Sequence, residues 1–297
     1  MTIEDDLIVE VEYGEANEEN VVFPGFLDVH VYAPETLIAT GVTGYLQAAQ
    51  SPVETTDPLC LGLHLEGPFL NPEAAGAIPV DRLLPVDLDL LESWLARGDV
   101  RLVTVSPELD FARDAIRLVS EGAIAGVGHT LANAATTRAA IEAGARFATH
   151  LWNAMRPLRA RETGPIATLL LDERVTIGLI GDGRHLHPSI EELTVRAAGA
   201  GRIALTSDRV AGPLTSDNRL AGGDISGASM VARFARFGLA EAATMASLVP
   251  ARLLGLTDRG RLEPGFRADL AVLDAELRPL QTLSAGKTVW ALRYPES

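Results

Sequence analysis

The sequence predicts an α/β protein built on a (β/α)8 TIM barrel, with a small β-sandwich domain made by the two ends of the chain. Three observations support this prediction: strand and helix patterns alternate along the middle of the chain, polar residues follow most of the strands, and further strand patterns lie outside the alternation. The chain has 297 residues, 47% of them hydrophobic, which is enough for a large buried core.

The alternation consists of eight short apolar runs with helical patterns between most of them. A repeated strand–helix order predicts a parallel sheet, and eight such strands are the number that closes a barrel. The runs lie at 26–30, 42–46, 61–65, 102–105, 124–127, 147–149, 175–180 and 203–206. The predicted helices lie at 87–97, 110–121, 132–143, 166–172 and 189–198.

Polar residues follow the carboxyl ends of most of these runs. Barrel enzymes build their active sites at that end. One polar residue after one strand is ordinary, because strands exit into polar loops, but a set with three histidines favours a shared site. The set is His30, Glu66, Glu108, His129, His150, Asp182 and Asp208.

The two ends of the chain contain alternating strand patterns outside the repeat. We expect residues 1–22 and 262–297 to form the small β domain and residues 23–261 to form the catalytic barrel. The segment 47–58 contains two prolines and leaves little room for a helix, so the barrel wall is expected to be trimmed near its first three strands.

Charge and cysteine content limit the partners and the location. A net charge of −15 repels phosphate backbones and anionic lipids, so neither nucleic acid nor a membrane is an expected partner. The single cysteine, Cys60, cannot form an internal disulfide. The first residues are acidic where a signal peptide is basic, and a cytoplasmic location is expected.

Glu66, His129 and His150 are the predicted metal ligands. Two histidines and one carboxylate leave a divalent metal an open position, as in catalytic sites, where the metal activates water. Asp208 is the predicted general base and acid, which takes a proton from the attacking water and delivers it to the leaving amine. On the residues alone, a turn or helix-capping aspartate is an equally good interpretation of Asp208.

Several motifs in this order resemble those of the N-acetylglucosamine-6-phosphate deacetylases, a family of the amidohydrolase superfamily, and the chain looks like a shortened member. The motifs are HLEGPFLN at 64–71, GHT at 128–130, THLWNAM at 149–155, GDGRHLHP at 181–188 and LTSD at 205–208. The resemblance implies hydrolysis of the acetamide of N-acetylglucosamine 6-phosphate, one divalent metal ion at the three ligands, and acid/base catalysis by Asp208. Zinc, iron, cobalt and manganese all suit such ligands.

The resemblance also implies how the sugar phosphate is bound. The backbone at Asn153 and Ala154, together with His185, would contact the sugar and its phosphate. An arginine from the neighbouring subunit of a homodimer would complete the phosphate site, and by spacing this is Arg161. Guanidinium groups suit this role because they match phosphate with two hydrogen bonds.

Two residues depart from the pattern. Tyr32 stands where many members of the superfamily place the second histidine of a His-x-His pair, so one metal is expected and His30 is a bystander or a weak ligand. Ile78 replaces a substrate-contacting histidine and cannot donate a hydrogen bond. Another N-acyl amino sugar or a cyclic amide, and a catalytically inactive barrel, therefore stay open as alternatives. His64 and His187 are expected to support the site without touching metal.

Overall fold

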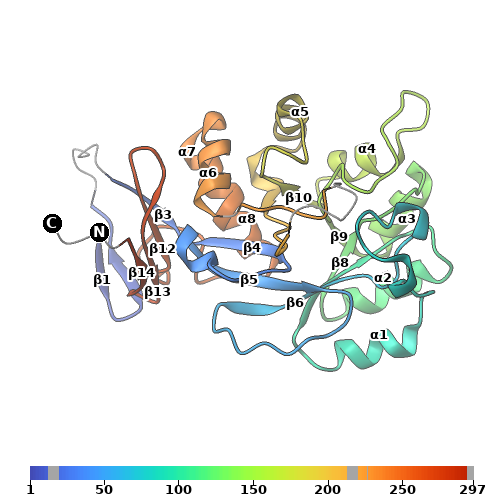
Figure 1. The fold of residues 1–297 in the computed structure, drawn as a ribbon, viewed down its shortest axis with the longest axis horizontal. Coiled ribbons are helices and arrows are strands. Elements are labelled where there is room, and N and C mark those ends of the chain that lie inside the picture. Colours follow the sequence, from blue (N-terminus) through green and yellow to red (C-terminus); the bar gives the residue numbers. More distant parts are fainter. Residues whose placement is uncertain (13–19, 213–219, 226, 293–297) are drawn as a thin grey trace.

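A computed structural model describes residues 1–12, 20–212, 220–225 and 227–292 (Figure 1). Its largest sheet has eight parallel strands in sequential order, and all eight predicted strands are confirmed, with ends that differ by at most three residues. The strands are β4 (Phe26–Val31), β5 (Val42–Ala49), β6 (Cys60–Glu66), β7 (Val100–Val105), β8 (Ile124–Val127), β9 (Ala145–Ala148), β10 (Thr176–Ile180) and β11 (Ile203–Thr206).

The first and last strands of this sheet meet and close the barrel. The backbone N–H of Asp208, just after β11, donates to the carbonyl of His30 in β4 over 3.0 Å. The backbone N–H of Tyr32 donates in turn to the carbonyl of Arg209 over 2.9 Å. The predicted TIM barrel is therefore confirmed, and its seam lies at the end where the candidate site residues gather.

The five predicted helices are confirmed to within two residues at either end. They are α1 (Leu88–Leu95), α2 (Ala112–Ser120), α3 (Ala134–Ala143), α4 (Gly164–Leu171) and α5 (Pro188–Ala198), and α6 (Ala228–Phe234), α7 (Leu239–Ala243) and α8 (Val249–Leu253) follow β11. Side chains cap the N-termini of α1 and α3, because Asp87 accepts from the N–H of Leu90 and Asn133 from that of Thr136. No helix in the described parts of the chain is long and apolar enough to cross a membrane.

The barrel wall is reduced near the first strands, as predicted. Only the short 3-10 helix η1 (Leu37–Thr40) connects β4 to β5, and the fully described segment from β5 to β6 contains no helix. Strand β13 (Pro279–Ser284) of the smaller sheet covers this part of the wall, and its Thr282 hydroxyl donates to the carbonyl of Ile38 over 2.6 Å. The chain's own C-terminal sheet thus replaces a missing helical layer.

The smaller β structure comes from both ends of the chain. Strands β3 (Asn20–Pro24), β12 (Leu270–Asp274), β13 and β14 (Lys287–Ala291) form an antiparallel sheet in the order β14-β13-β12-β3. A hairpin of β1 (Thr2–Glu4) and β2 (Leu7–Glu10) shares with it a small core around Ile8 and Leu270. A small β domain is confirmed, while its boundaries at 22 and 262 stay a prediction, and residues 13–19 and 293–297 lie outside the described residues.

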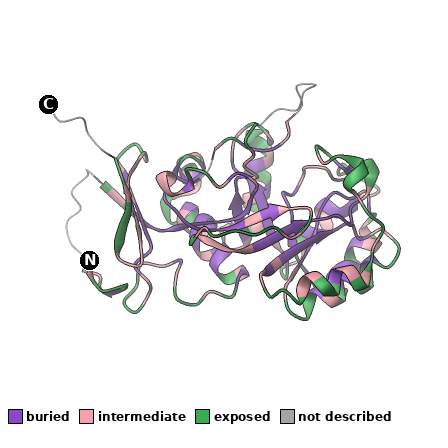
Figure 2. Ribbon diagram, turned by 60° about the horizontal axis from the view of Figure 1, so that its bottom comes forward, coloured by how far each residue is buried: buried purple, intermediate pink, exposed green. Residues whose placement is uncertain are grey.

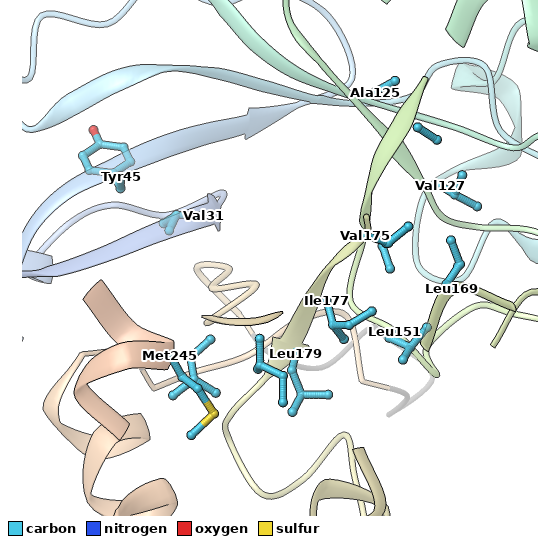
Figure 3. Packing of buried hydrophobic residues seen from close by; sticks show 14 of the residues in the cluster. Val31, Tyr45, Ala125, Val127, Leu151, Leu169, Val175, Ile177, Leu179 and Met245 are labelled. Atoms are coloured by element: carbon cyan, nitrogen blue, oxygen red, sulfur yellow. The ribbon is translucent and has the colours of Figure 1, made fainter. Parts of the chain in front are cut away.

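The core has two parts, one on each face of the barrel sheet. Alternate residues of the strands, such as Leu46 and Phe147, fill the barrel interior. The larger part lies between the strands and the surrounding helices, and Figure 3 shows Ile177 and Leu179 of β10 in the packing that includes Met245. Figure 2 shows the same arrangement as buried strands surrounded by helices whose outer faces are exposed. This packing gives the strand ends a rigid frame.

Candidate active site

The predicted metal ligands lie together at the carboxyl ends of three strands. Glu66 is the last residue of β6, and His129 and His150 follow β8 and β9 by two residues. Oε1 of Glu66 lies 3.0 Å from Nε2 of His129 and 2.8 Å from Nε2 of His150, and the two nitrogens lie 3.1 Å apart. All three side chains are buried. Barrel geometry thus brings together residues that are 63 and 84 positions apart.

Three of the site residues have left-handed backbone conformations. The φ angles are +47° at His129, +33° at His150 and +47° at Asp208. Such conformations cost roughly 1–3 kcal/mol for a residue other than glycine and persist where surrounding contacts hold them, typically at functional sites. Here Ser106 contributes such a contact, since its hydroxyl donates to the carbonyl of His129 over 2.5 Å. The strain aims all three side chains at one point.

The hydrogen bonds of the imidazoles suit metal binding. Nδ1 of His129 lies 2.9 Å from the carbonyl of Ala74, so it must carry the proton and leave a lone pair on Nε2. Nδ1 of His150 is buried and has no hydrogen-bond partner among the described residues. One carboxylate oxygen and two imidazole nitrogens in this arrangement are a donor set for zinc or a similar divalent cation.

His30 was expected to be a bystander or a weak ligand, and its position in the cluster contradicts the first and agrees with the second. Its Nε2 is 3.3 Å from Oε1 of Glu66 and 3.2 Å from Oδ1 of Asp208. Burial lowers the pKa of His30, but the two carboxylates outweigh burial and raise it to about 10. Together with Glu66 and His150, His30 also forms a set whose ligand atoms lie close enough to hold a metal ion. The position of His30 at a strand end indicated a site residue, but the tyrosine at position 32 argued against a metal-binding His-x-His pair.

His64 supports His30 from deeper inside the barrel. Their Nδ1 atoms lie 2.8 Å apart, and Nδ1 of His64 also lies 2.9 Å from the carbonyl of Val29. Nε2 of His64 lies 2.8 Å from the hydroxyl of Thr104. Burial and the charge of His30 hold the pKa of His64 well below its usual range. Because the Nδ1 side of His30 faces His64, its Nε2 faces the carboxylates of Glu66 and Asp208.

Electrostatics keep Glu66 ionised. Burial by itself raises the pKa of a carboxyl group, but His30 and His129 oppose burial and hold the pKa of Glu66 well below its usual range. Oδ1 of Asp208 lies 3.2 Å from the same Nε2 of His30, and 13% of the Asp208 side chain is exposed. A buried anionic ligand and a partly accessible carboxylate therefore face one imidazole nitrogen.

Tyr32 and Gln50 belong to the site and were missed as contacts by the sequence analysis. The hydroxyl of Tyr32 donates to Oε2 of Glu66, and Nε2 of Gln50 donates to the hydroxyl of Tyr32 over 2.8 Å. Burial and the adjacent carboxylate raise the pKa of Tyr32 well above its usual value. No sequence motif marks this pair, because it depends on how the short β5–β6 segment packs.

A pocket of about 470 Å³ opens over these residues, within the range of small-molecule sites. The predicted substrate residues Asn153, Ala154 and His185 line it, as do Ile78 and the exposed Arg82. The remaining lining residues are Tyr32, Gln50, Glu66, Gly76, Ala77, Pro79, His129, His150, Asp208, Val210, Leu220 and Ala221. The pocket therefore has the candidate metal ligands in one part and apolar residues around them.

Two carboxylates near the pocket, Asp182 and Glu108, hold the loops that carry site residues. Asp182 lies 2.8 Å from Nδ1 of His185, and although burial raises its pKa, the bonds from His185 and nearby N–H groups lower that pKa to about 2. Glu108 accepts from the hydroxyl of Thr130 and the N–H of Leu131, next to His129. Both carboxylates therefore order loops instead of entering the cluster.

Two predicted positions lie outside the pocket. Arg161 is exposed in the loop before α4 and does not line the pocket of its own chain. His187 is exposed and caps α5, where its Nδ1 accepts from the N–H of Ser189. The expectation that His187 supports the site is wrong, because a proline follows it and starts a helix there.

Comparison with known proteins gives the family of this chain. The model of the amidohydrolase family matches residues 35–290. The N-acetylglucosamine-6-phosphate deacetylase of Bacillus subtilis is 30% identical over 92% of this chain and 85% of its own length. The N-acetylgalactosamine-6-phosphate deacetylase of Shewanella sp. is 32% identical over 86% of this chain and 72% of its own.

Solved structures with the same fold carry the same family name. The crystal structure of N-acetyl-D-glucosamine-6-phosphate deacetylase from Mycobacterium smegmatis has a TM-score of 0.90 and 30% identity, covering 97% of this chain and 94% of that one. A mutant of that protein in complex with N-acetyl-D-glucosamine-6-phosphate has a TM-score of 0.87 and 31% identity, covering 97% and 93%.

The barrel and its His/Glu cluster define a hydrolase of amide bonds. The chain belongs to the amidohydrolase family and, within it, to the N-acetylglucosamine-6-phosphate deacetylases.

Proposed function

We propose that this chain hydrolyses the acetamide of N-acetylglucosamine 6-phosphate to glucosamine 6-phosphate and acetate, as its relatives' names suggest. The observation that carries the proposal is the convergence of Glu66, His129 and His150 beside Asp208 within one pocket. A barrel that only binds a ligand does not need two left-handed histidines aimed at a carboxylate. This favours an enzyme over the inactive barrel.

The three ligands would hold one divalent cation per subunit. We propose zinc, with iron, cobalt and manganese as the alternatives that the same donor set accepts. Bound there, the cation would acidify a water molecule and polarise the carbonyl of the acetamide. Oε1 of Glu66 and the Nε2 atoms of His129 and His150 are the donors.

Asp208 is the proposed proton carrier. Its carboxylate lies at the edge of the cluster, with Oδ1 3.2 Å from Nε2 of His30 and part of the side chain accessible from the pocket. It would accept a proton from the attacking water and deliver it to the nitrogen of the leaving amine. His30 keeps the carboxylate oriented through this contact.

The sugar phosphate would lie against Asn153, Ala154 and His185, which line the pocket. Arg161 of a second subunit in a homodimer is the proposed phosphate ligand, since it is exposed and outside its own pocket. Arg82 is a further candidate, because it lines the pocket and makes no ion pair within the described ranges of the chain. Guanidinium at the pocket mouth would attract an anion that the net charge of −15 otherwise repels.

A related amino sugar is the second candidate substrate. Ile78 lines the pocket and contributes no hydrogen bond to a sugar hydroxyl, and one relative is named for the N-acetylgalactosamine derivative. These two sugars differ in the orientation of one hydroxyl group, so loss of a single donor bears on the choice. A cytoplasmic location stays a prediction.

Acetate release with purified, metal-loaded protein tests the proposal. We expect hydrolysis of N-acetylglucosamine 6-phosphate that is lost after chelation and restored by zinc, iron, cobalt or manganese. His150→Ala should abolish it, whereas His187→Ala, at the exposed helix cap, should not. Turnover of the galactosamine derivative or another acylated amine alone would favour the second candidate, and a protein that binds no metal and hydrolyses none of them would refute both.

A further inference from the structure

The two oxygens of Glu66 have different partners. Oε1 faces the imidazoles of His129, His150 and His30 at 3.0, 2.8 and 3.3 Å. Oε2 faces away from them and accepts the proton of the Tyr32 hydroxyl. Only one oxygen of this carboxylate is therefore presented to the cluster.

Gln50 supports the direction of the Tyr32 proton. A phenol has one proton to donate, and a carboxylate can only accept. Nε2 of Gln50 donates to the Tyr32 oxygen over 2.8 Å, so the phenol proton is left for Oε2 of Glu66. The chain Gln50 to Tyr32 to Glu66 thus has a single hydrogen-bond direction.

Strands on both sides hold the backbone of Tyr32. Its N–H donates to the carbonyl of Arg209 over 2.9 Å, and its own carbonyl accepts from Nε2 of Gln47 over 3.0 Å. The ring also packs edge-on against His30, with centroids 5.7 Å apart. Tyr32 is therefore fixed at its backbone, its ring and its hydroxyl, which a residue that merely fills space does not require.

We propose that Tyr32, directed by Gln50, is a positioning residue that holds Oε2 of Glu66 and confines metal binding to Oε1. The Tyr32 proton competes with a cation for Oε2, which disfavours both chelation of one cation by the two oxygens and bridging of two cations. One cation per chain is therefore the favoured number. The inference rests on the proposed metal centre and goes beyond it, since it concerns how one ligand is presented.

Metal titration of the apoprotein, prepared by chelation, tests the inference without substrate. Tyr32→Phe keeps the ring and removes the proton donor. Hydrogen bonds to metal ligands typically contribute 10- to 100-fold to affinity, so we expect the Kd for Zn²⁺, measured against a chromophoric chelator, to rise by about that factor. In the Co²⁺-loaded variant, entry of Oε2 into the coordination sphere should weaken the visible absorption bands.

Tyr45→Phe is the matched control. It removes the hydroxyl of another buried tyrosine, on β5. That hydroxyl donates to Asp57 over 2.9 Å and does not contact the cluster. We expect its Zn²⁺ affinity and its Co²⁺ spectrum to equal those of the wild type. Gln50→Leu keeps the Tyr32 hydroxyl and loses only its orientation, so the Kd should rise about threefold to tenfold.

The outcomes separate this inference from the proposed function. Wild-type affinity and an unchanged Co²⁺ spectrum in Tyr32→Phe would overturn the positioning role and leave the metal centre intact. A wild-type protein that binds no cation would remove the metal centre and the inference together. If Tyr32→Phe does not fold, Gln50→Leu decides, and an unchanged Kd in that variant contradicts the proposal.

Discussion

Replacing Asp208 by asparagine isolates its proposed role in proton transfer. Asparagine has nearly the same size and shape, and it tolerates left-handed backbone as aspartate does, so the φ of +47° at this position should persist. The backbone N–H that donates to the carbonyl of His30 is unchanged. The side chain can still contact Nε2 of His30 but can no longer exchange a proton.

The expected loss follows from that difference. General acid–base catalysis contributes about 10²- to 10⁴-fold, or about 3–5 kcal/mol of activation free energy. Metal content and substrate affinity should change little, because Asp208 is outside the three-ligand set and contacts Nε2 of His30 at 3.2 Å. The predicted result is a fall in kcat with a nearly constant KM.

Steady-state acetate release, metal analysis and calorimetric substrate binding measure these quantities. Asp5→Asn is a matched control, because Asp5 also has left-handed backbone, φ +53°, but lies in the turn of the N-terminal hairpin. It should retain wild-type kcat. A kcat of Asp208→Asn within threefold of the wild type would refute the assignment, and loss of metal would show that Asp208 is a ligand instead.

Three further predictions concern the phosphate site, pH dependence and a buried ion pair. Arg161→Ala or Arg82→Ala should raise KM for the sugar phosphate about tenfold or more, because a charged hydrogen bond contributes about 1.5–3 kcal/mol. The KM for N-acetylglucosamine, which has no phosphate, should not change. Unchanged KM values for the sugar phosphate in both variants would place the phosphate elsewhere. Burial raises the pKa of Asp28 from 3.8 to about 6, so the folded state holds this proton more tightly, and the resulting stability is present below about pH 4 and lost by pH 6. The free energy of unfolding of Asp28→Asn, relative to wild type, should therefore increase by about 3 kcal/mol from pH 4 to pH 7 in urea titrations, and a constant difference would contradict this. Glu191 is fully buried between two arginines, so Glu191→Gln should destabilise by about 3–5 kcal/mol in the same assay, whereas Glu192→Gln, in an exposed pair, should change stability by under about 0.5 kcal/mol.

Strands and helices could be predicted because each one carries its own local signal. Strand β8, for example, is a short apolar run between a helical pattern and the polar end at His129, and its bounds were predicted exactly as 124–127. The helix ends were less exact by one or two residues, since capping contacts such as that of Asn133 fix them. The covering of the reduced wall by β13 has no local signal, because it joins segments more than 200 residues apart.

The candidate site divides in the same way. Glu66, His129, His150 and Asp208 could be named because each ends or follows a barrel strand, and barrel topology then forces them together. The contact of Tyr32 with Glu66 could not, because it depends on side-chain direction and on a partner, Gln50, in an irregular segment. Sequence position indicates which residues gather at the site. Only the three-dimensional packing shows which oxygen of Glu66 each of them contacts.

The closing seam of the barrel also links binding to folding. The hydrogen bond between Asp208 and His30 joins the first and last strands of the eight-strand order, so the two residues share one site only when the barrel is closed. A cation on the proposed ligands, or a substrate in the pocket, would bind the closed barrel and not the open chain. At a concentration of 100 times its Kd, such a ligand adds about 2.7 kcal/mol to the free energy of unfolding. Thermal stability and occupancy of the site are therefore linked in this protein, and its melting temperature should rise when the site is filled.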